Sequence, residues 1–154
     1  MITYRRAKLS DVEDILSLIN YYAEQGIMLP RTRSTLYEGI REVIVAVDGD
    51  SDRVVGTGSL HIIWDDLAEI RTLAVDENYR GQGIGRKIID LLLDEARELH
   101  CPKVFTLTYQ VEFFKHMGFT LTDKNAMPHK VWRDCINCVK FPNCDENAMI
   151  LYLD

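Results

Sequence analysis

The chain has 154 residues, of which 47% are apolar and 27% charged, and its formal net charge is −6. A length of this order predicts one domain, residues 1–154, with enough apolar side chains for a core, which excludes wholesale disorder. The negative net charge argues against a general nucleic-acid-binding protein, whose surface is normally basic. The sequence has neither an apolar run of the ~20 residues that span a membrane nor the apolar core of a signal peptide at its start. We therefore expect a cytoplasmic protein without nucleic-acid or membrane partners.

The first part of the chain predicts a strand and two helices. Residues 2–6 form the predicted strand, and Ser10 is placed to cap a helix, with Glu13 completing a capping box. The buried face of that helix is predicted from apolar residues at three- and four-residue spacing, namely Val12, Ile15, Leu16, Leu18 and Ile19. The segment 27–33 contains a proline and basic residues, which indicates a loop, and a second helix is expected after Ser34.

Three runs rich in β-branched and apolar residues follow and predict strands: 43–47, 54–63 and 70–75. An acidic turn, 48–52, joins the first two and predicts a hairpin. Gly56 and Gly58 interrupt the second run, which indicates a bulge or a close approach of another segment.

A glycine-rich turn, Arg80-Gly81-Gln82-Gly83-Ile84-Gly85, joins the third strand to a long helical pattern. From Arg86 onward the expected buried face consists of Ile88, Ile89, Leu92, Leu93, Ala96 and Leu99. The first N–H groups of a helix lack intrahelical partners, and the helix dipole adds about half a positive charge there. Glycines leave this backbone bare, and Arg80 and Arg86 add charge, so the turn predicts a pyrophosphate site.

Two common phosphate-binding loops do not fit this turn. A Rossmann fingerprint has GxGxxG spacing early in an alternating β-α-β chain, with an acidic residue about 20 residues later. A P-loop ends in Gly-Lys-Ser/Thr, whereas this turn continues as Gly85-Arg86-Lys87. A tight turn without a ligand remains the structural alternative.

The C-terminal part of the chain predicts shorter elements. They are a strand at 104–107, a helix at 111–117 closed by Gly118, and strands at 119–121 and 148–153, with an irregular segment at about 124–146. Antiparallel strands followed by a strand–helix–strand crossover predict an α/β (α+β) fold. Its sheet is expected to be mixed and mostly antiparallel, with helices on both faces.

The sequence from Val75 to Gly85 resembles motif A of the GNAT acyltransferases, whose pattern is Arg/Gln-x-x-Gly-x-Gly/Ala, and 113–119 resembles the family's short helix ending in Gly-Phe. The resemblance covers about residues 1–123 and the last strand. It implies the GNAT acyl-CoA N-acyltransferase fold with acetyl-CoA as cosubstrate. The pyrophosphate would meet backbone N–H groups of the turn, and the pantetheine would pair with the central strand. The cofactor-binding residues that it implies are Leu73, Ala74, Val75, Arg80, Gly81, Gln82, Gly83, Ile84, Gly85, Arg86 and Phe114.

A narrower resemblance covers residues 26–36 and Ile40-Arg41, which are similar to the start of the transferase domain of N-acetylglutamate synthases. It implies a short, single-domain form that acetylates the α-amine of glutamate in arginine biosynthesis, without feedback through an amino-acid-kinase domain. Arginine forks suit carboxylates. Arg31, Arg33 and Arg71 are therefore candidate clamps for the acceptor, and a solvated surface arginine is the alternative for each.

Direct transfer needs a base for the amine, stabilisation of the oxyanion and an acid for the thiolate. Glu69 enters the central strand and is the candidate base, directly or through a water. Phe114 stands where the family commonly has a tyrosine and cannot donate a proton. Tyr109 is the substitute acid, with packing as its alternative role. His61 and His116 are weaker base candidates.

Four potential ligands gather in the irregular segment: His129, Cys135, Cys138 and Cys144. Zinc favours such sets, but only one CxxC is present, so zinc is possible and free thiols are favoured. Cys101 lies at a helix end beside a proline, a poor place for a nucleophile, so we expect no acyl-enzyme.

Two other functions fit the same residues. One is a GNAT enzyme acting on another amine, such as a polyamine, an antibiotic or a protein N-terminus. The other is a non-catalytic acetyl-CoA-binding module, which the phenylalanine at position 114 supports. The sequence predicts a monomer or homodimer with a small-molecule amine acceptor.

Overall fold

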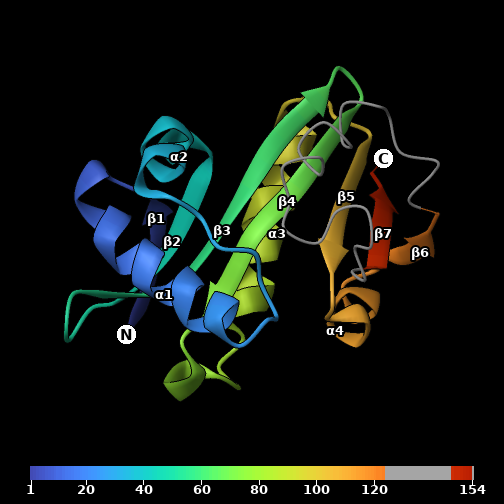
Figure 1. The fold of residues 1–154 in the computed structure, drawn as a ribbon. Helices are drawn as coiled ribbons and strands as arrows, with labels where there is room; N and C mark the ends of the chain where they lie inside the picture. The colour runs from blue at the N-terminus through green and yellow to red at the C-terminus, as the bar shows by residue number, and fades with distance from the viewer. Residues whose placement is uncertain (124–146, 154) are drawn as a thin grey trace. The chain divides into compact units, whose positions relative to one another are not determined.

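A computed structural model describes residues 1–123 and 147–153. These residues form two compact units (Figure 1). Unit 1 comprises residues 1–61 and 70–95, and unit 2 comprises 62–69 and the described residues from 96 onward. The described strands lie in the order β1-β2-β3-β4-β5-β7-β6. The β1–β2 and β2–β3 pairings lie within unit 1, and the β4–β5, β5–β7 and β6–β7 pairings lie within unit 2. No helix of the described residues is long and apolar enough to cross a lipid bilayer.

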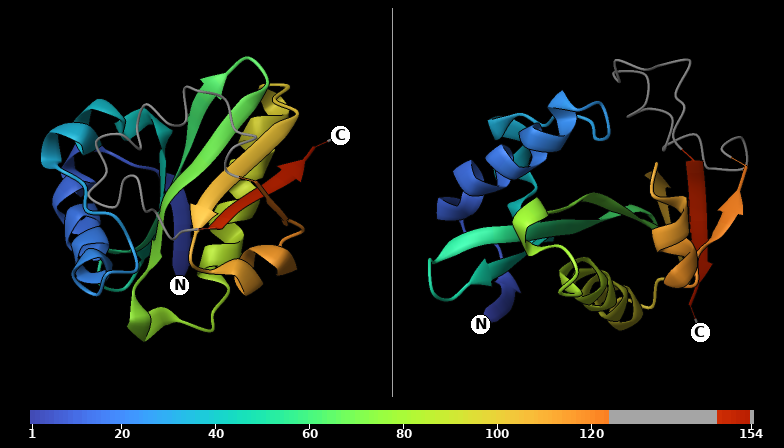
Figure 2. Two further views of the ribbon diagram at one scale, coloured as in Figure 1. Left: turned by 45° about the vertical axis from the view of Figure 1, so that its right-hand side comes forward. Right: turned by 90° about the horizontal axis from the view of Figure 1, so that it is seen from below.

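Unit 1 contains the N-terminal elements and the long helix. Its strands are β1 (Ile2–Arg6), β2 (Val43–Asp48), β3 (Arg53–Trp64) and β4 (Leu67–Val75), and its helices are α1 (Val12–Glu24), α2 (Arg33–Glu38) and α3 (Ile84–Glu98). The end of β3, the start of β4 and the last residues of α3 belong to unit 2. Three 3-10 turns are η1 (Leu9–Asp11), η2 (Ile40–Glu42) and η3 (Glu77–Tyr79). β1 and β3 both pair antiparallel with β2. In Figure 2, α1 and α2 cover one face of these strands and α3 covers the other, as the sequence predicted.

The face covered by α1 and α2 is closed by apolar side chains. The cluster consists of Val12, Ile15, Leu16, Ile19, Leu36, Val43, Val45, Val47 and Val54. Alternate residues of β2 and the predicted stripe of α1 therefore meet in one core, because a strand repeats every two residues and a helix every 3.6. This confirms the predicted helical stripe and the predicted strand.

The face covered by α3 depends on two glycines of β3. A Cβ placed on Gly56 would lie 2.8 Å from Ile84 Cγ2, and one on Gly58 would lie 2.7 Å from Ile88 Cγ2. Carbon atoms do not approach that closely, so only glycine lets α3 lie against this strand. The predicted close approach at these glycines is confirmed.

Several predicted helix ends were wrong. Ser10 lies within η1 and does not cap a helix; Lys8 is the N-cap residue of this turn, and its N–H donates a hydrogen bond of 2.7 Å to the carboxylate of Asp11. α2 begins one residue before Ser34, at Arg33, because the Thr32 side chain accepts from Thr35 N and caps the helix there.

The limits of α3 also differ from the prediction. The helix begins at Ile84, inside the glycine motif, and not at Arg86. Leu99 is 57% exposed and lies one residue past the helix end, so it does not belong to the buried stripe.

Unit 2 contains β5 (Lys103–Thr108), α4 (Val111–His116), β6 (Thr120–Thr122) and β7 (Asn147–Tyr152). The first residues of β4 pair in parallel with β5, and the parallel register covers only Leu67 to Glu69. β7 pairs antiparallel with both β5 and β6. The sheet is thus mixed and mostly antiparallel, as predicted. Leu67, Phe105 and Ile150 close the core of this unit.

A partly buried ion pair joins β1 to Asp11, the residue directly before α1. Arg5 donates two hydrogen bonds to the Asp11 carboxylate, of 2.7 and 3.0 Å. Asp11 is 7% exposed. The Arg5 hydrogen bonds, together with the Lys8 backbone N–H, hold the pKa of Asp11 below its ordinary value even though burial acts to raise it.

We expect Asp11→Asn to lower the free energy of unfolding at pH 7 by about 2 kcal/mol, because a partly desolvated guanidinium loses its charged acceptor. The pKa of Asp11 is lower in the folded than in the unfolded chain. Its stabilisation is therefore complete above the unfolded-state value near 4 and is lost as the pH falls through the folded-state value. Denaturant unfolding between pH 7 and pH 2 should show an acid-dependent loss of stability that is smaller in the variant.

The matched control is the exposed pair of Glu13 and Arg33, which has the same two-bond geometry, at 2.8 and 2.8 Å. Both side chains are more than half exposed. Glu13→Gln should change the unfolding free energy little, because water screens an exposed pair. Equal losses in the two variants would contradict the role given to burial at Asp11.

Candidate active site

The glycine turn presents bare backbone at the start of α3. Gly81 and Gly83 have φ angles of +83° and +76°, and no atom lies within 4 Å of a Cβ placed on either. These positions therefore need glycine for conformation and not for space. The first helical hydrogen bond runs from Lys87 N to Gly83 O at 3.0 Å. The N–H groups of residues 83–86 precede it and point away from the helix, as an anion site requires.

Tyr22 of α1 connects this turn to the end of β4. Its hydroxyl donates a hydrogen bond to Val75 O and accepts one of 3.2 Å from Arg80. The Arg80 guanidinium also lies over the Tyr22 ring, 5.7 Å from the ring centre. Tyr22 is 6% exposed and packs with Leu18 and Ala74. One core side chain thus fixes both the strand end and the arginine beside the turn.

The sequence analysis did not identify Tyr22 as a functional residue. Its spacing from Leu18 and Ile19 marks it only as part of the buried face of α1. The target of its hydroxyl, Val75, lies 53 residues away in sequence and cannot be read from that spacing.

Thr72, near the middle of β4, has a left-handed backbone with a φ of +52°. A β-branched residue rarely adopts this conformation, which costs about 1–2 kcal/mol. Its Oγ1 lies 3.1 Å from Ser59 Oγ, and Ser59 Oγ donates to the carbonyl of Arg71 at 3.1 Å. The strand is therefore irregular at Thr72, directly before the predicted pantetheine segment Leu73–Val75. Strained backbone of this kind is concentrated at functional sites.

A small pocket of about 60 Å³ lies beside this irregularity. We refer to it as the arginine pocket, and its lining residues are Arg31, Thr35, Leu36, Gly39, Glu42, Val43, Ser59, His61, Arg71 and Thr72. Two of the predicted acceptor residues, Arg31 and Arg71, are therefore brought together from a loop and from β4. Both are half-buried and have contacts with other residues.

Arg33, the third predicted clamp, is placed differently. It is the first residue of α2 and forms its two hydrogen bonds with Glu13, whose carboxylate holds the pKa of Arg33 above its ordinary value. It does not line the arginine pocket among the described residues. A single residue, Thr32, separates Arg31 from Arg33 in sequence, but the helix that Thr32 caps places the two arginines in different surroundings.

A carboxylate–imidazole pair also lines the arginine pocket. His61 Nδ1 lies 2.7 Å from Glu42 Oε2, and the two side chains are 36% and 34% exposed. His61 comes from β3 and Glu42 from η2. The pocket therefore combines two guanidinium groups, one carboxylate and one imidazole.

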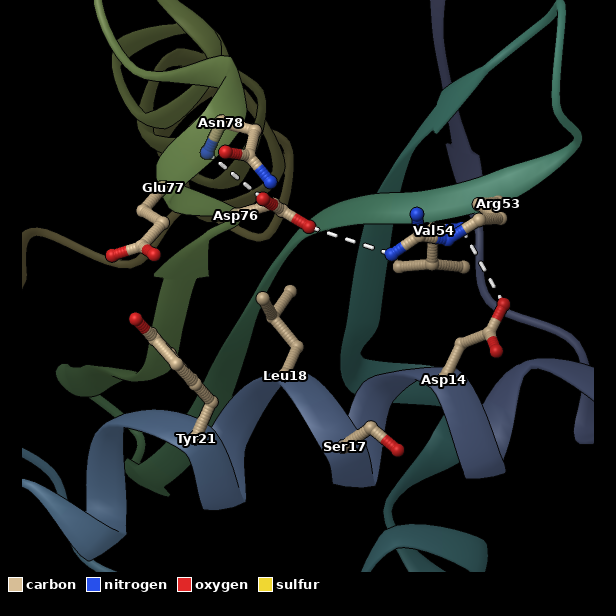
Figure 3. A pocket seen from close by; sticks show the side chains of 9 residues that line it. All are labelled: Asp14, Ser17, Leu18, Tyr21, Arg53, Val54, Asp76, Glu77 and Asn78. Atoms are coloured by element: carbon tan, nitrogen blue, oxygen red, sulfur yellow. Dashed lines mark hydrogen bonds and ion pairs between the residues drawn. The ribbon is translucent and has the colours of Figure 1, made fainter.

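A larger pocket, of about 350 Å³, lies between α1, the start of β3 and η3 (Figure 3). Its polar groups bond mainly to one another: Asp76 accepts from Arg53 at 3.5 Å and from Asn78 N at 2.9 Å. Asp14 accepts from Val54 N at 3.5 Å. No residue predicted to bind cofactor or acceptor lines this pocket in the described part of the chain.

Comparison with known proteins decides the family. Residues 9–119 match the Acetyltransferase (GNAT) family. The chain belongs to this family.

Two similar proteins are named as acetyltransferases. An amino-acid acetyltransferase of Mycobacterium tuberculosis is 49% identical over 117 residues, which are 75% of this chain and 67% of the relative. An uncharacterised N-acetyltransferase of Chlorobaculum tepidum is 40% identical over 95% of this chain and 93% of the relative.

Solved structures show the same GNAT fold. A Mycobacterium tuberculosis protein crystallised with CoA has a TM-score of 0.86 and 38% identity, and the likeness covers 99% of both chains. N-acetylglutamate synthase from Neisseria gonorrhoeae, complexed with CoA and N-acetyl-glutamate, has a TM-score of 0.90 at 24% identity. That likeness covers all of this chain but 35% of the synthase. The predicted GNAT fold is confirmed.

Within this GNAT chain, the predicted proton-transfer residues belong to unit 2. Glu69 is 8% exposed on β4, and Tyr109 is half-buried directly after β5. Phe114 is 2% exposed, and its ring packs edge-on against Phe113 and Phe119 with centres 5.2 Å apart in each case. Phe114 therefore supports α4 from within the core and leaves almost no surface for a cofactor.

The described cysteine is unsuited to a GNAT reaction through a covalent intermediate. Cys101 is buried, its thiol donates to Lys103 O at 3.3 Å, and burial raises its pKa. A thiol held neutral is a poor nucleophile. The zinc candidates His129, Cys135, Cys138 and Cys144 lie outside the described residues, and the described residues contain no cluster able to hold a metal.

Proposed function

We propose that the chain transfers the acetyl group of acetyl-CoA directly to the α-amine of an amino acid, with L-glutamate as the favoured acceptor. The observation that carries this proposal is the convergence of Arg31 and Arg71 in one pocket beside the irregular part of β4. The names of the relatives, amino-acid acetyltransferase and N-acetylglutamate synthase, support it. Such an enzyme would act in the cytoplasm, in arginine biosynthesis.

The cofactor half of the site is the glycine turn with the end of β4. The bare N–H groups at residues 83–86 would bind the pyrophosphate, with Arg80 and Arg86 adding positive charge. Ile70–Val75 extends beyond the last residue of β4 that pairs in parallel with β5. Its backbone groups would pair with the pantetheine amides near Leu73–Val75. The CoA bound in the solved relatives supports this half of the proposal.

The acceptor half is the arginine pocket. Glutamate carries two carboxylates and one amine, and each guanidinium can bind a carboxylate through two parallel hydrogen bonds. Arg31 and Arg71 supply two such groups, and Ser59 and Thr72 line the same pocket. A cationic polyamine would meet the wrong charge there. This complementarity favours an anionic acceptor over the other amines.

The chemistry would be divided among residues of β4 and the segment after β5. Glu69 would take the proton of the ammonium, directly or through a water, so that the nitrogen lone pair can attack the thioester carbonyl. A backbone N–H of Leu73–Val75 would stabilise the oxyanion. As the C–S bond breaks, Tyr109 would protonate the departing CoA thiolate, because Phe114 has no hydroxyl, and the resulting phenolate would take the second proton that the acceptor nitrogen loses. Holding both substrates in one orientation would supply much of the rate.

A thiol-release assay over the twenty amino acids, spermidine and aminoglycosides tests the proposal. We expect CoA release that depends on glutamate and a product acetylated at the α-nitrogen. Turnover on spermidine or an aminoglycoside alone would show that the acceptor is a cationic amine and not an amino acid. Tight binding of acetyl-CoA without turnover on any acceptor would favour the non-catalytic alternative.

Arg31→Ala should raise the KM for glutamate about tenfold or more and change the KM for acetyl-CoA little, because one charged hydrogen-bonding partner of the acceptor is lost. Steady-state kinetics with each substrate varied in turn measures both constants. Arg33→Ala is the matched control and should leave the KM for glutamate unchanged. An equal rise of the KM for glutamate in both variants would show that the effect comes from the loss of positive charge in general and not from a contact in the arginine pocket.

Tyr22→Phe should weaken acetyl-CoA binding by about threefold to tenfold, because Arg80 and Val75 lose their shared hydroxyl. Titration calorimetry with acetyl-CoA measures this directly. Tyr21→Phe, one residue earlier on the same helix, is the control and should bind acetyl-CoA normally. An unchanged affinity in Tyr22→Phe would contradict the role given to this hydroxyl.

A further inference from the structure

Thr72 of β4 holds a backbone conformation that its own side chain opposes. Its φ is +52°, and a β-branched residue with a positive φ returns to the extended form unless its surroundings prevent this. Ser59 of β3 contacts Thr72 and is 7% exposed, so water competes little for its hydrogen bonds. Ser59 is therefore the candidate for the group that maintains the left-handed backbone.

The contacts of Ser59 lie on both sides of the rotation that φ describes. Ser59 Oγ donates a hydrogen bond of 3.1 Å to the carbonyl oxygen of Arg71 and lies 3.1 Å from Thr72 Oγ1. Since the single proton of the Ser59 hydroxyl goes to Arg71, the Thr72 hydroxyl donates in the second contact. The angle φ of Thr72 is the rotation about the bond between its N and Cα atoms. The Arg71 carbonyl is attached to one end of this bond and the Thr72 side chain to the other, so one oxygen atom fixes the rotation.

The rotation at Thr72 directs the backbone that follows it. The first group to follow is the N–H of Leu73, in the segment proposed to bind the pantetheine and the oxyanion. A left-handed residue breaks the regular alternation of backbone groups along a strand, as it does in a β-bulge. An N–H that stabilises a developing oxyanion is effective only if it points at the oxygen before the reaction begins. A residue that fixes φ at position 72 therefore acts on the rate.

We propose that Ser59 is a positioning residue, which holds Thr72 in the left-handed conformation and so aims the N–H of Leu73 at the carbonyl oxygen of the acetyl group. The inference rests on the proposed function, because it takes Leu73–Val75 as the cofactor segment. In this role Ser59 needs no contact with the acetyl group or the acceptor nitrogen. Its effect is on kcat, since the oxyanion exists only in the transition state and not in the bound substrates.

Glycine at position 72 tests this role, because glycine adopts a positive φ without steric cost. Ser59→Ala should lower kcat about tenfold in the wild-type background but less than about twofold in the Thr72→Gly background. The KM values for glutamate and acetyl-CoA should change less than about threefold in Ser59→Ala. An equal fall of kcat in both backgrounds, or an effect on the KM for glutamate alone, would overturn the proposal.

Thr57 provides a matched control on the same strand. It lies two residues before Ser59 and therefore on the same face of β3. Its side chain is fully buried, and its hydroxyl has no hydrogen-bond partner among the described residues. Thr57→Val thus removes a buried hydroxyl without breaking a hydrogen bond, and should keep kcat within about twofold of the wild-type value. An equal fall of kcat in Thr57→Val and Ser59→Ala would overturn the specific role of Ser59.

A spectroscopic measurement tests the direction of the Leu73 N–H without any acceptor. The carbonyl ¹³C resonance of acetyl-CoA labelled at that carbon should move downfield on binding to the wild-type protein, because a hydrogen bond polarises the carbonyl. The displacement should be smaller in Ser59→Ala and should return when Ser59→Ala is combined with Thr72→Gly. The same displacement in all three proteins would overturn the proposal.

The proposed function and the role of Ser59 can fail separately. If the resonance responds as expected but no amino acid is acetylated, the acceptor assignment fails and the role of Ser59 stands. If the wild-type enzyme acetylates glutamate while Ser59→Ala keeps the wild-type kcat and resonance, the role of Ser59 fails and the proposed function stands.

Discussion

The close packing of α3 against β3 is the constraint on which the cofactor half of the proposed site depends. Gly56 and Gly58 leave room for Ile84 and Ile88, whose Cγ2 atoms would otherwise lie under 3 Å from a Cβ. A β-branched side chain has one strongly preferred rotamer in a helix, so these methyl groups cannot swing aside. The first turns of α3 are therefore fixed against the strand. The position of the bare N–H groups at the start of α3 follows from this packing, because the helix is rigid over so short a distance.

The acceptor half of the proposed site shares residues 71–75 of β4 with the cofactor half. Arg71 lines the arginine pocket, Thr72 carries the strained backbone, and Val75 accepts from Tyr22. These three positions lie within five consecutive residues of one strand. The spacing between the proposed acceptor and cofactor groups is thus set by covalent geometry, at about 3.3 Å per residue. Direct transfer between two substrates benefits from such fixed spacing, since misplacement by about 1 Å can cost a hundredfold in rate.

The sequence predicted the order of elements, the mixed sheet, the glycine turn and the family, because these depend on periodicity and on a local motif. It failed at the contacts that depend on tertiary structure. Arg31 and Arg33 look equivalent in sequence, yet only Arg31 lines the pocket, because the cap at Thr32 begins a helix between them. The hydroxyl of Tyr22 and the pairing of Glu42 with His61 join residues 53 and 19 positions apart. No local spacing encodes such partners.

The overall charge of −6 suggests at first a cationic acceptor, but the distribution of charge argues otherwise. In the larger pocket of Figure 3, Asp76 is already bound to Arg53 and to a backbone N–H. Charges elsewhere on the surface are screened beyond about 8 Å at physiological ionic strength. A bound acceptor therefore responds to the groups that it touches, and in the arginine pocket, the proposed acceptor site, these are two guanidinium groups, a carboxylate and an imidazole. Local pairing, and not net charge, decides which substrate such a pocket can accept.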